Sequence, residues 1–282
     1  MRKVAIFADG AGDIPEEIAK KYNVGLLYGT VSINGVEYID KLTINPSEMF
    51  ELSKATKSLP KTSAVNIDTY VEAFTPYLNK GYEIVNINLS SQISAAYHNA
   101  QVIAKERDDI FLIDSHSLSS GIAHLVIEAG EMRDKGYSAK QIHDSLIQLR
   151  DKVHATFVLN TLEYMAAGGR CSTVTAFGAN ILGIKPCIEM DKNGALQVIK
   201  KYRGNLAKVL PNYVHDQLTQ NKKIRTDKIF ITYSSATPEI VDIVRNAISK
   251  VATFDNIYET TASCTIATHC GPGTLGILFM SE

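Results

Sequence analysis

Short apolar runs alternate with longer amphipathic segments through the first half of the chain. Each run ends in polar residues, as a buried strand does, and each amphipathic segment has the spacing of a helix. Strands that alternate with helices indicate βαβ units, and therefore a largely parallel sheet covered by helices on both faces. The predicted strands are Val4–Ala8, Glu83–Leu89 and Ile110–Ile113, and the last two helices of this half span 117–135 and 138–152.

Turn and capping residues mark several boundaries between these elements. Gly25–Asn34 is predicted as one strand, and Asn34-Gly35 predicts a hairpin before Val36-Glu37-Tyr38. Pro15-Glu16-Glu17 is typical of a helix start, with proline in the first turn and acids near the positive end of the helix dipole. Asn45-Pro46-Ser47-Glu48 has the cap, the proline and the acidic third position of another helix start.

The pattern changes after residue 153 to one that predicts an α+β unit with a mixed sheet. Asn193-Gly194 lies between two strand-like segments and predicts a second hairpin. We therefore expect two domains, a three-layer α/β/α domain over 1–153 and an α+β domain over 154–282, with a ligand site between them. The elements predicted in the second half are Ala155–Leu159, Leu162–Ala167, Pro186–Asp191, Leu196–Arg203, 205–220, 228–233 and 238–251.

Composition narrows the class of protein. The chain has 282 residues, 45% of them hydrophobic, with a net charge of −1, so it can bury a core and lacks the basic excess of a nucleic-acid-binding protein. No apolar run reaches the ~18 residues of a membrane span, and the run that ends at Asp9 is too short for a signal peptide. We expect a cytoplasmic protein with buried thiols at Cys171, Cys187, Cys264 and Cys270, since no pair has metal or redox spacing.

The common nucleotide and hydrolase motifs are missing from the sequence. There is no phosphate loop, no Gly-x-Ser-x-Gly elbow and no His-Glu-x-x-His pair. Gly10-Ala11-Gly12 follows the first predicted strand, but Pro15 stands where a dinucleotide fingerprint needs its third glycine. Residues 30–34 also lack the acid that would bind the ribose. The sequence therefore predicts no nucleotide or cofactor bound by this chain.

Polar clusters lie at the ends of the predicted strands or in the loops after them. In open α/β sheets ligands bind outside the carboxyl ends of the strands, so most of these clusters are expected to face one crevice. We interpret Asp13, Asp114 and Ser115 as helix caps. We assign Thr62, Ser94 and His269 to the site on the resemblance that follows, and the turn at Gly271-Pro272-Gly273 can hold His269 in one place. The clusters are Asp9…Asp13-Ile14-Pro15, Lys61-Thr62-Ser63, Ser90-Ser91…Ser94, Asp114-Ser115, Gly168-Gly169-Arg170-Cys171-Ser172 and His269.

These clusters, in this order and at these intervals, resemble the DegV family of bacterial fatty-acid-binding proteins over essentially the whole chain. The resemblance also includes Leu162-Glu163-Tyr164, Gly183-Ile184-Lys185-Pro186 and Arg203. It implies a two-domain protein that binds one long-chain fatty acid and delivers it to a separate kinase subunit, which holds ATP and magnesium and makes acyl-phosphate. It further implies that Thr62, Ser94 and His269, with Ser63 less certain, surround the carboxyl group, and that Arg170 and Arg203 meet the kinase near the mouth.

The sequence departs from the family pattern near the expected carboxyl site. Gly10 stands where the family usually has serine. The family often has Thr-Ser-x-Pro, whereas here Thr62-Ser63 is followed by Ala64-Val65, so valine stands in the place of the proline. Ala95 and Ala96 replace the glycine and threonine that usually follow Ser94. These changes remove hydroxyls and add bulk, so they bear on the hydrogen bonds of the head group.

Two other functions fit parts of the sequence. A hydrolase would use Ser94 as nucleophile and His269 as base, but no acid that orients the histidine can be assigned. A lipid carrier or sensor would bind the same ligand without a kinase partner. A bound acid would be either a carboxylate beside a protonated His269 or a protonated acid beside a neutral one.

Several residues also have structural interpretations. Gly168-Gly169 could simply end a helix with Arg170 paired to an acid, and Arg203 could be an ordinary charge at a strand end. Side chains that line a tunnel cannot be told from core by pattern. Phe177, Ile181 and Leu182 lie on a helical period, and we interpret them as core.

Overall fold

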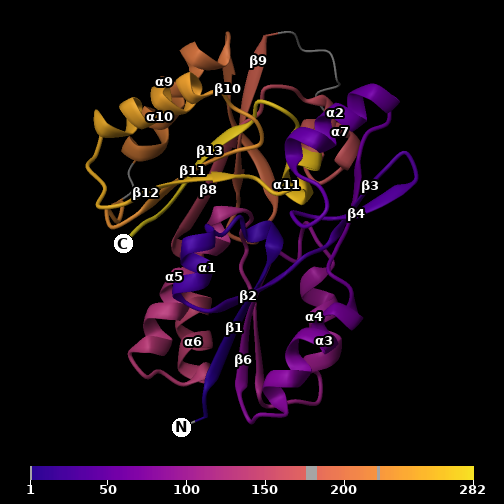
Figure 1. Ribbon diagram of the computed structural model, residues 1–282. Coiled ribbons are helices and arrows are strands. Elements are labelled where there is room, and N and C mark those ends of the chain that lie inside the picture. Colours follow the sequence, from indigo (N-terminus) through magenta and orange to yellow (C-terminus); the bar gives the residue numbers. More distant parts are fainter. Residues whose placement is uncertain (1, 176–182, 221–222) are drawn as a thin grey trace.

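Figure 1 shows a computed structural model that describes residues 2–175, 183–220 and 223–282. Two sheets follow one another along the long axis of the molecule, each with helices packed on it. One sheet is parallel and the other is mixed, which confirms the predicted α/β fold class. The three residues assigned to core on their helical period, Phe177, Ile181 and Leu182, lie outside the described residues.

The parallel sheet has four strands in the order β2-β1-β6-β7. Its helices lie on both sides, with α3 and α4 on one face and α1, α5 and α6 on the other (Figure 1). The strands are β1 (Val4–Asp9), β2 (Val24–Leu27), β6 (Glu83–Asn88) and β7 (Ile110–Asp114). The helices are α1 (Glu16–Lys21), α3 (Ile67–Leu78), α4 (Ala96–Ala104), α5 (Ser120–Asp134) and α6 (Ala139–Leu149), with short 3-10 turns at Gly10–Gly12 and Arg150–Lys152.

The mixed sheet has six strands in the order β10-β9-β8-β13-β11-β12. Only the β11–β12 pair among these is parallel. The last strand in the chain, β13, therefore lies inside the sheet, between β8 and β11. The strands are β8 (Val153–Val158), β9 (Ile184–Met190), β10 (Leu196–Arg203), β11 (Ile229–Tyr233), β12 (Ile257–Thr261) and β13 (Leu275–Met280). The helices of this half are α7 (Glu163–Gly168), α8 (Ser172–Thr175), α9 (Leu206–Thr219), α10 (Pro238–Ser249) and α11 (Cys264–Cys270).

A third, small sheet joins the two halves. It has the order β4-β3-β5, with β3 (Thr30–Ile33), β4 (Val36–Ile39) and β5 (Lys61–Ser63), and α2 (Pro46–Thr56) follows its hairpin. Val31 and Met49 from this region pack against Cys264 and Ala267 of α11. The small sheet thus belongs to the first half of the sequence but rests on a helix of the second.

The prediction of one strand over Gly25–Asn34 is wrong, because the segment divides between two sheets. A Cβ at Gly29 would lie 2.3 Å from the carbonyl oxygen of Ser63, so the chain crosses β5 closely at this glycine and changes direction. Both predicted hairpins are present, with Ile33 paired to Val36 and Met190 paired to Leu196. The predicted helix start at Asn45 is confirmed by a capping box with Glu48.

The interpretation of Asp13, Asp114 and Ser115 as helix caps is also wrong. Asp13 has a left-handed φ of 46°, and α1 begins only at Glu16, without a side-chain cap. The carboxylate of Asp114 accepts from the backbone amides of Ser91 and His116, and the Ser115 hydroxyl donates to the Ser117 carbonyl. The Asp13 carboxylate accepts from the Ser119 hydroxyl and from the Ser263 amide. None of the three side chains therefore caps the helix that follows it in the sequence.

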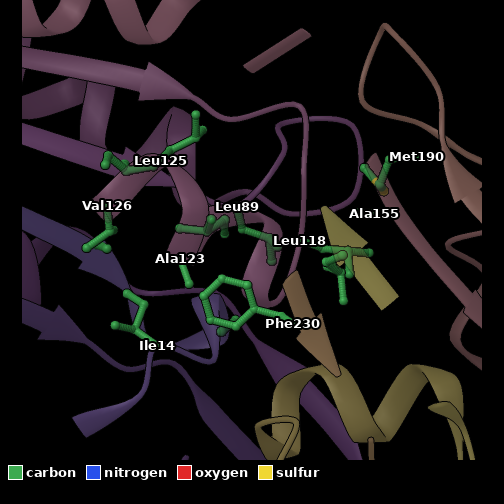
Figure 2. Close-up of a cluster of buried hydrophobic side chains, with 14 of the residues drawn as sticks. Ile14, Leu89, Leu118, Ala123, Leu125, Val126, Ala155, Met190 and Phe230 are labelled. Carbon is green, nitrogen blue, oxygen red and sulfur yellow. The ribbon is translucent and has the colours of Figure 1, made fainter. Parts of the chain in front are cut away.

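The main core is continuous across the two larger sheets. Side chains from the parallel half, such as Leu89 and Leu118, share one buried cluster with Met190 and Phe230 of the mixed sheet. Figure 2 shows these side chains with neighbours from α5. The mixed sheet begins with β8 at Val153, and the domain boundary near that residue stays a prediction.

Candidate functional site

A pocket lies where the parallel half, the small sheet and the mixed sheet meet. It contains about 1000 Å³ of space not filled by atoms, part of it open to solvent. The residues that line it come from segments far apart in the sequence, from Thr62 on β5 to Leu278 on β13. The apolar wall includes Leu89, Ile93, Leu118, Phe157, Met165, Leu196, Ile266 and Leu278.

The hydroxyl groups in the wall are mostly engaged by the protein. Thr156 bonds the Tyr213 hydroxyl at 2.7 Å, and Thr232 bonds the Thr260 hydroxyl at 2.7 Å. Ser234 donates to the carbonyl of Gly271 at 2.6 Å. These bonds satisfy the donors, so the pocket offers a ligand a largely apolar surface. This is the kind of wall that suits a hydrocarbon chain.

Thr62 and His269 meet at one part of the pocket wall. The Thr62 hydroxyl lies 3.0 Å from Nε2 of His269, although the two residues are 207 positions apart. Thr62 comes from β5, and His269 from the last turn of α11. Ser63, the next residue on β5, is exposed and also lines the pocket.

Two buried carboxylates hold the helix that carries His269. Ser263 caps α11, and its own backbone amide donates to Asp13 at 2.7 Å. Asp40 accepts from the backbone amides of Cys264 and Thr265, both at 2.8 Å. Negative charge at a helix N-terminus is favourable, so these contacts fix α11 in place. The role of Asp40 is not predicted from the sequence, because no local signal connects this residue with a helix more than 200 residues away.

Burial and charge keep the imidazole of His269 neutral at ordinary pH. Burial, and to a smaller extent the positive charge of Arg170, lower the pKa of His269 to about 4 from 6.5. A neutral imidazole has one donor and one acceptor nitrogen. His269 can therefore act as a hydrogen-bonding group at this site, and at neutral pH it carries no charge.

Ser94 lies on the loop between β6 and α4, which also lines the pocket. Its amide donates to the Ser90 carbonyl at 3.1 Å, and its hydroxyl accepts from the Ala96 amide at 3.2 Å. Ser90 in turn donates to the Gly194 carbonyl at 2.7 Å, at the tip of the β9–β10 hairpin. This contact ties the loop of Ser94 to the mixed sheet.

The two arginines occupy different places. Arg170 is exposed and lines the pocket. It donates from Nη1 to the carbonyl of Gly168 at 2.6 Å, so its partner is a backbone oxygen and not an acid. Gly169 ends α7 in the left-handed region, with a φ of 67°. Arg203 lies exposed at the end of β10 and is not among the residues that line the pocket.

The departures from the family pattern have different surroundings. A Cβ at Gly10 would lie 2.2 Å from the Tyr28 ring, so a serine would require that ring to move. Ala64 and Ala95 line the pocket. Ala96 is buried, and its carbonyl accepts from the Tyr70 hydroxyl at 3.3 Å, so its methyl faces the protein interior and not solvent.

The described residues show neither a metal cluster nor a membrane span. Within residues 2–175, 183–220 and 223–282, no group of three or more histidine, cysteine, aspartate or glutamate side chains is arranged to hold a metal ion. No helix in the same ranges has the length and apolar character needed to cross a bilayer. All four cysteines are buried, as predicted.

Comparison with known sequences identifies relatives along the whole chain. Residues 3–282 match the model of an uncharacterised protein family, the DegV family. A DegV domain-containing protein of Clostridium acetobutylicum is 29% identical over 287 residues, and all of both chains is covered. A DegV domain-containing protein of Listeria innocua is 30% identical over 284 residues, again with all of both chains covered.

Comparison with solved structures gives the same fold. A DegV family protein of Thermus thermophilus, described as binding fatty acid, superposes with a TM-score of 0.90 at 22% identity and covers both chains entirely. A fatty-acid-binding DegV family protein of Streptococcus agalactiae gives a TM-score of 0.88 at 24% identity, and DegV of Bacillus subtilis, described as a fatty acid binding protein, gives 0.84 at 23%. Both cover the whole chain.

Proposed function

This chain belongs to the DegV family, and we propose that it binds one long-chain fatty acid, with the carboxyl group beside Thr62, Ser94 and His269. The observation that carries the proposal is the combination of a largely apolar wall with the hydroxyl–imidazole pair at Thr62 and His269. Fatty acid binding by the DegV proteins of Thermus thermophilus and Bacillus subtilis supports the choice of ligand.

The tail supplies most of the affinity in this proposal. Burial of each methylene contributes ~0.8 kcal/mol, so a 16-carbon tail contributes on the order of 12 kcal/mol before the costs of association. The head-group contacts then serve chiefly to place the carboxyl group. A buried carboxylate without hydrogen-bond donors would be costly, and the hydroxyls of Thr62, Ser63 and Ser94 are donors within the same wall.

The bound acid would be presented to a kinase subunit. Transfer of a phosphoryl group needs the carboxylate as nucleophile, with a nucleotide and magnesium held in line. In this proposal the partner supplies the nucleotide and the metal, and this chain supplies the substrate. Arg170 at the pocket, and Arg203 at the end of β10, are the positive charges that we assign to the joint surface, where arginine can bind phosphate oxygens.

The geometry does not favour a hydrolase. His269 Nε2 bonds to Thr62 and not to Ser94, and the Ser94 hydroxyl accepts from a backbone amide. Nδ1 of His269 has no carboxylate partner among the described residues, so no acid orients the ring as a catalytic triad requires. We therefore interpret Ser94 as a head-group ligand.

The test of ligand binding is extraction of the purified protein with organic solvent after denaturation, followed by mass spectrometry. One equivalent of a C14–C18 acid, released only on denaturation, is the expected result. An empty extract, together with no uptake of labelled fatty acid, would contradict the proposal.

Variants then test the head-group assignment. Thr62→Val removes the hydroxyl at nearly constant volume and should weaken fatty acid binding roughly 10- to 100-fold, as expected for a lost hydrogen bond to a charged group. Thr75→Val is the matched control, since Thr75 is exposed on α3 and its hydroxyl bonds only to its own helix. Equal affinity of the two variants would remove Thr62 from the site.

The kinase partner needs a separate experiment. Arg170→Ala should lower the rate of acyl-phosphate formation with a kinase subunit from a DegV system, measured at saturating fatty acid so that a change in fatty acid affinity does not contribute. Formation at the normal rate would remove Arg170 from the joint surface. If no kinase subunit phosphorylates the acid bound to the wild-type protein, a carrier or sensor function is favoured instead.

A further inference from the structure

The hydrogen bond between Thr62 and His269 can run in either direction. If Nε2 carries the proton, the imidazole donates to the Thr62 oxygen, and the hydroxyl proton of Thr62 is left for another acceptor. If Nδ1 carries the proton, Thr62 must donate to Nε2, and its single proton is used. The surroundings of Nδ1 decide which arrangement holds.

Nδ1 of His269 is buried against the backbone of Gly168. It has no hydrogen-bond partner among the described residues. A Cβ built on Gly168 would lie 2.3 Å from Nδ1, and 3.2 and 3.4 Å from Cε1 and Cγ, the two ring atoms bonded to Nδ1. A point 2.3 Å from Nδ1 that lies this far from both neighbouring ring atoms is in the ring plane, close to the axis of the nitrogen lone pair. In glycine a Cα hydrogen lies along the Cα–Cβ direction, so it approaches Nδ1 close to this axis.

A C–H group is a suitable neighbour for a lone pair and an unsuitable one for an N–H. A Cα–H that faces an acceptor makes a weak favourable contact. A proton on Nδ1 would instead meet the Cα hydrogen directly and would remain a buried donor without an acceptor, which is costly. The close approach of Gly168 therefore favours the tautomer that is protonated at Nε2.

We propose that Gly168 is a positioning residue that holds His269 as the Nε2-protonated tautomer, so that the imidazole donates to Thr62 and the Thr62 hydroxyl donates to the ligand carboxylate. The role of the carboxylate rests on the proposed fatty acid function, whereas the tautomer does not. Arg170 also contacts this glycine, by a hydrogen bond of 2.6 Å to the Gly168 carbonyl. Gly168 thus contacts both Arg170 and His269.

The tautomer can be measured directly in the wild-type protein. Long-range proton–nitrogen NMR spectra of histidine-labelled protein separate protonated from bare ring nitrogens, and His269→Gln assigns the signal among the seven histidines. At neutral pH we expect Nε2 protonated and Nδ1 bare for His269. A protonated Nδ1, either alone or with Nε2, would overturn the proposal. This readout needs neither ligand nor a folded Gly168 variant.

Gly168→Ala tests the positioning role. Its φ lies outside the left-handed region, so alanine suits the backbone, but the methyl would meet Nδ1 and displace the ring. We expect about tenfold weaker fatty acid binding, the loss of roughly one hydrogen bond, and a changed His269 signal. Ala167→Ser, at the exposed neighbouring position on α7, is the control and should bind normally. Normal binding with an unchanged tautomer in Gly168→Ala would overturn the role, and absence of binding in the wild type would instead contradict the proposed function.

Discussion

Asp13 accepts a hydrogen bond at 2.7 Å from the backbone amide of Ser263, a residue 250 positions away that caps the helix of His269. The other oxygen of the same carboxylate accepts from the Ser119 hydroxyl at 2.6 Å, and Lys41 lies 3.1 Å away as a partly exposed counter-charge. One buried carboxylate thus joins the first loop, the start of α5 and the start of α11.

Removal of this carboxylate should destabilise the protein and loosen the site. Asp13→Ala leaves Lys41 without its partner and the Ser263 amide without an acceptor, so we expect a loss of about 3 kcal/mol in the free energy of unfolding. Urea denaturation measures the change. Glu16→Ala, which removes an exposed ion pair with Lys20, is the control and should have little effect. Similar midpoints for the two variants would contradict the role given to Asp13.

Leu118 should influence the length of acid that is bound. Leu118 and Leu125 belong to the same core cluster (Figure 2). Leu118 lines the pocket, whereas Leu125 is not among the residues that line it. A larger side chain in either place overpacks the core and should cost about 1–3 kcal/mol of stability. Only Leu118→Phe should also shift the preference toward shorter acids, as measured by competition among acids of graded length. The same shift in Leu125→Phe would show that the effect is not local to the pocket wall.

The contact between Ser90 and Gly194 should support the loop of Ser94. Gly194 has a φ of 85°, and a Cβ there would lie 2.2 Å from the Ser90 hydroxyl oxygen. Gly194→Ala should therefore lower both stability and fatty acid affinity. Gly35→Ala isolates the backbone effect, because Gly35 has a φ of 80° and no atoms within 4 Å of its Cβ position. We expect Gly35→Ala to lose stability but to bind normally. If both variants bind alike, the hairpin tip does not support the loop.

Acid should destabilise the protein through His269. Burial, and then the charge of Arg170, lower its pKa to about 4 in the folded protein, from 6.5. Between these two values the unfolded chain binds a proton that the folded chain does not, so the free energy of unfolding falls as the pH is lowered through this window. Above pH 6.5 the contribution of His269 is constant.

Comparison with His269→Gln isolates this contribution. His124, whose pKa burial also lowers to about 4, acts in the same sense as His269. Asp9, whose pKa burial raises to about 7, acts in the opposite sense. His124 and Asp9 both remain in His269→Gln. The free energy of unfolding should therefore fall less between pH 7 and pH 5 in this variant than in wild type, and the difference is the contribution of His269. An identical difference in the two proteins would show that His269 titrates normally.

Local signals in the sequence account for much of the fold. The two Asn-Gly turns and the capping box at Asn45 predict elements through contacts a few residues apart, and these predictions hold. β5 and α11 carry Thr62 and His269 but have only 3 and 7 residues, too few for a periodic pattern. β5 is ordered by its pairing with β3, and α11 is ordered by contacts from Asp13 and Asp40. No local pattern reveals these long-range contacts.

Less of the site than of the fold can be predicted from the sequence. Serine, threonine and aspartate at strand ends are ambiguous, and Asp13, Asp114 and Ser115, which we assigned as caps, do not cap the helices that follow them. That Thr62 and His269 share a site is predicted only through the resemblance to a family, and their hydrogen bond is not predicted at all. The approach of Gly168 to the imidazole depends on backbone direction, which residue types do not encode.

The order of the strands has a consequence for how the pocket forms. β13 follows the other five strands of the mixed sheet in the sequence, yet it lies between β8 and β11 and supplies Leu278 to the pocket wall. A chain that lacks these residues has an open seam in the mixed sheet and no complete pocket. Closure of the mixed sheet and completion of the pocket are therefore a single event that requires β13.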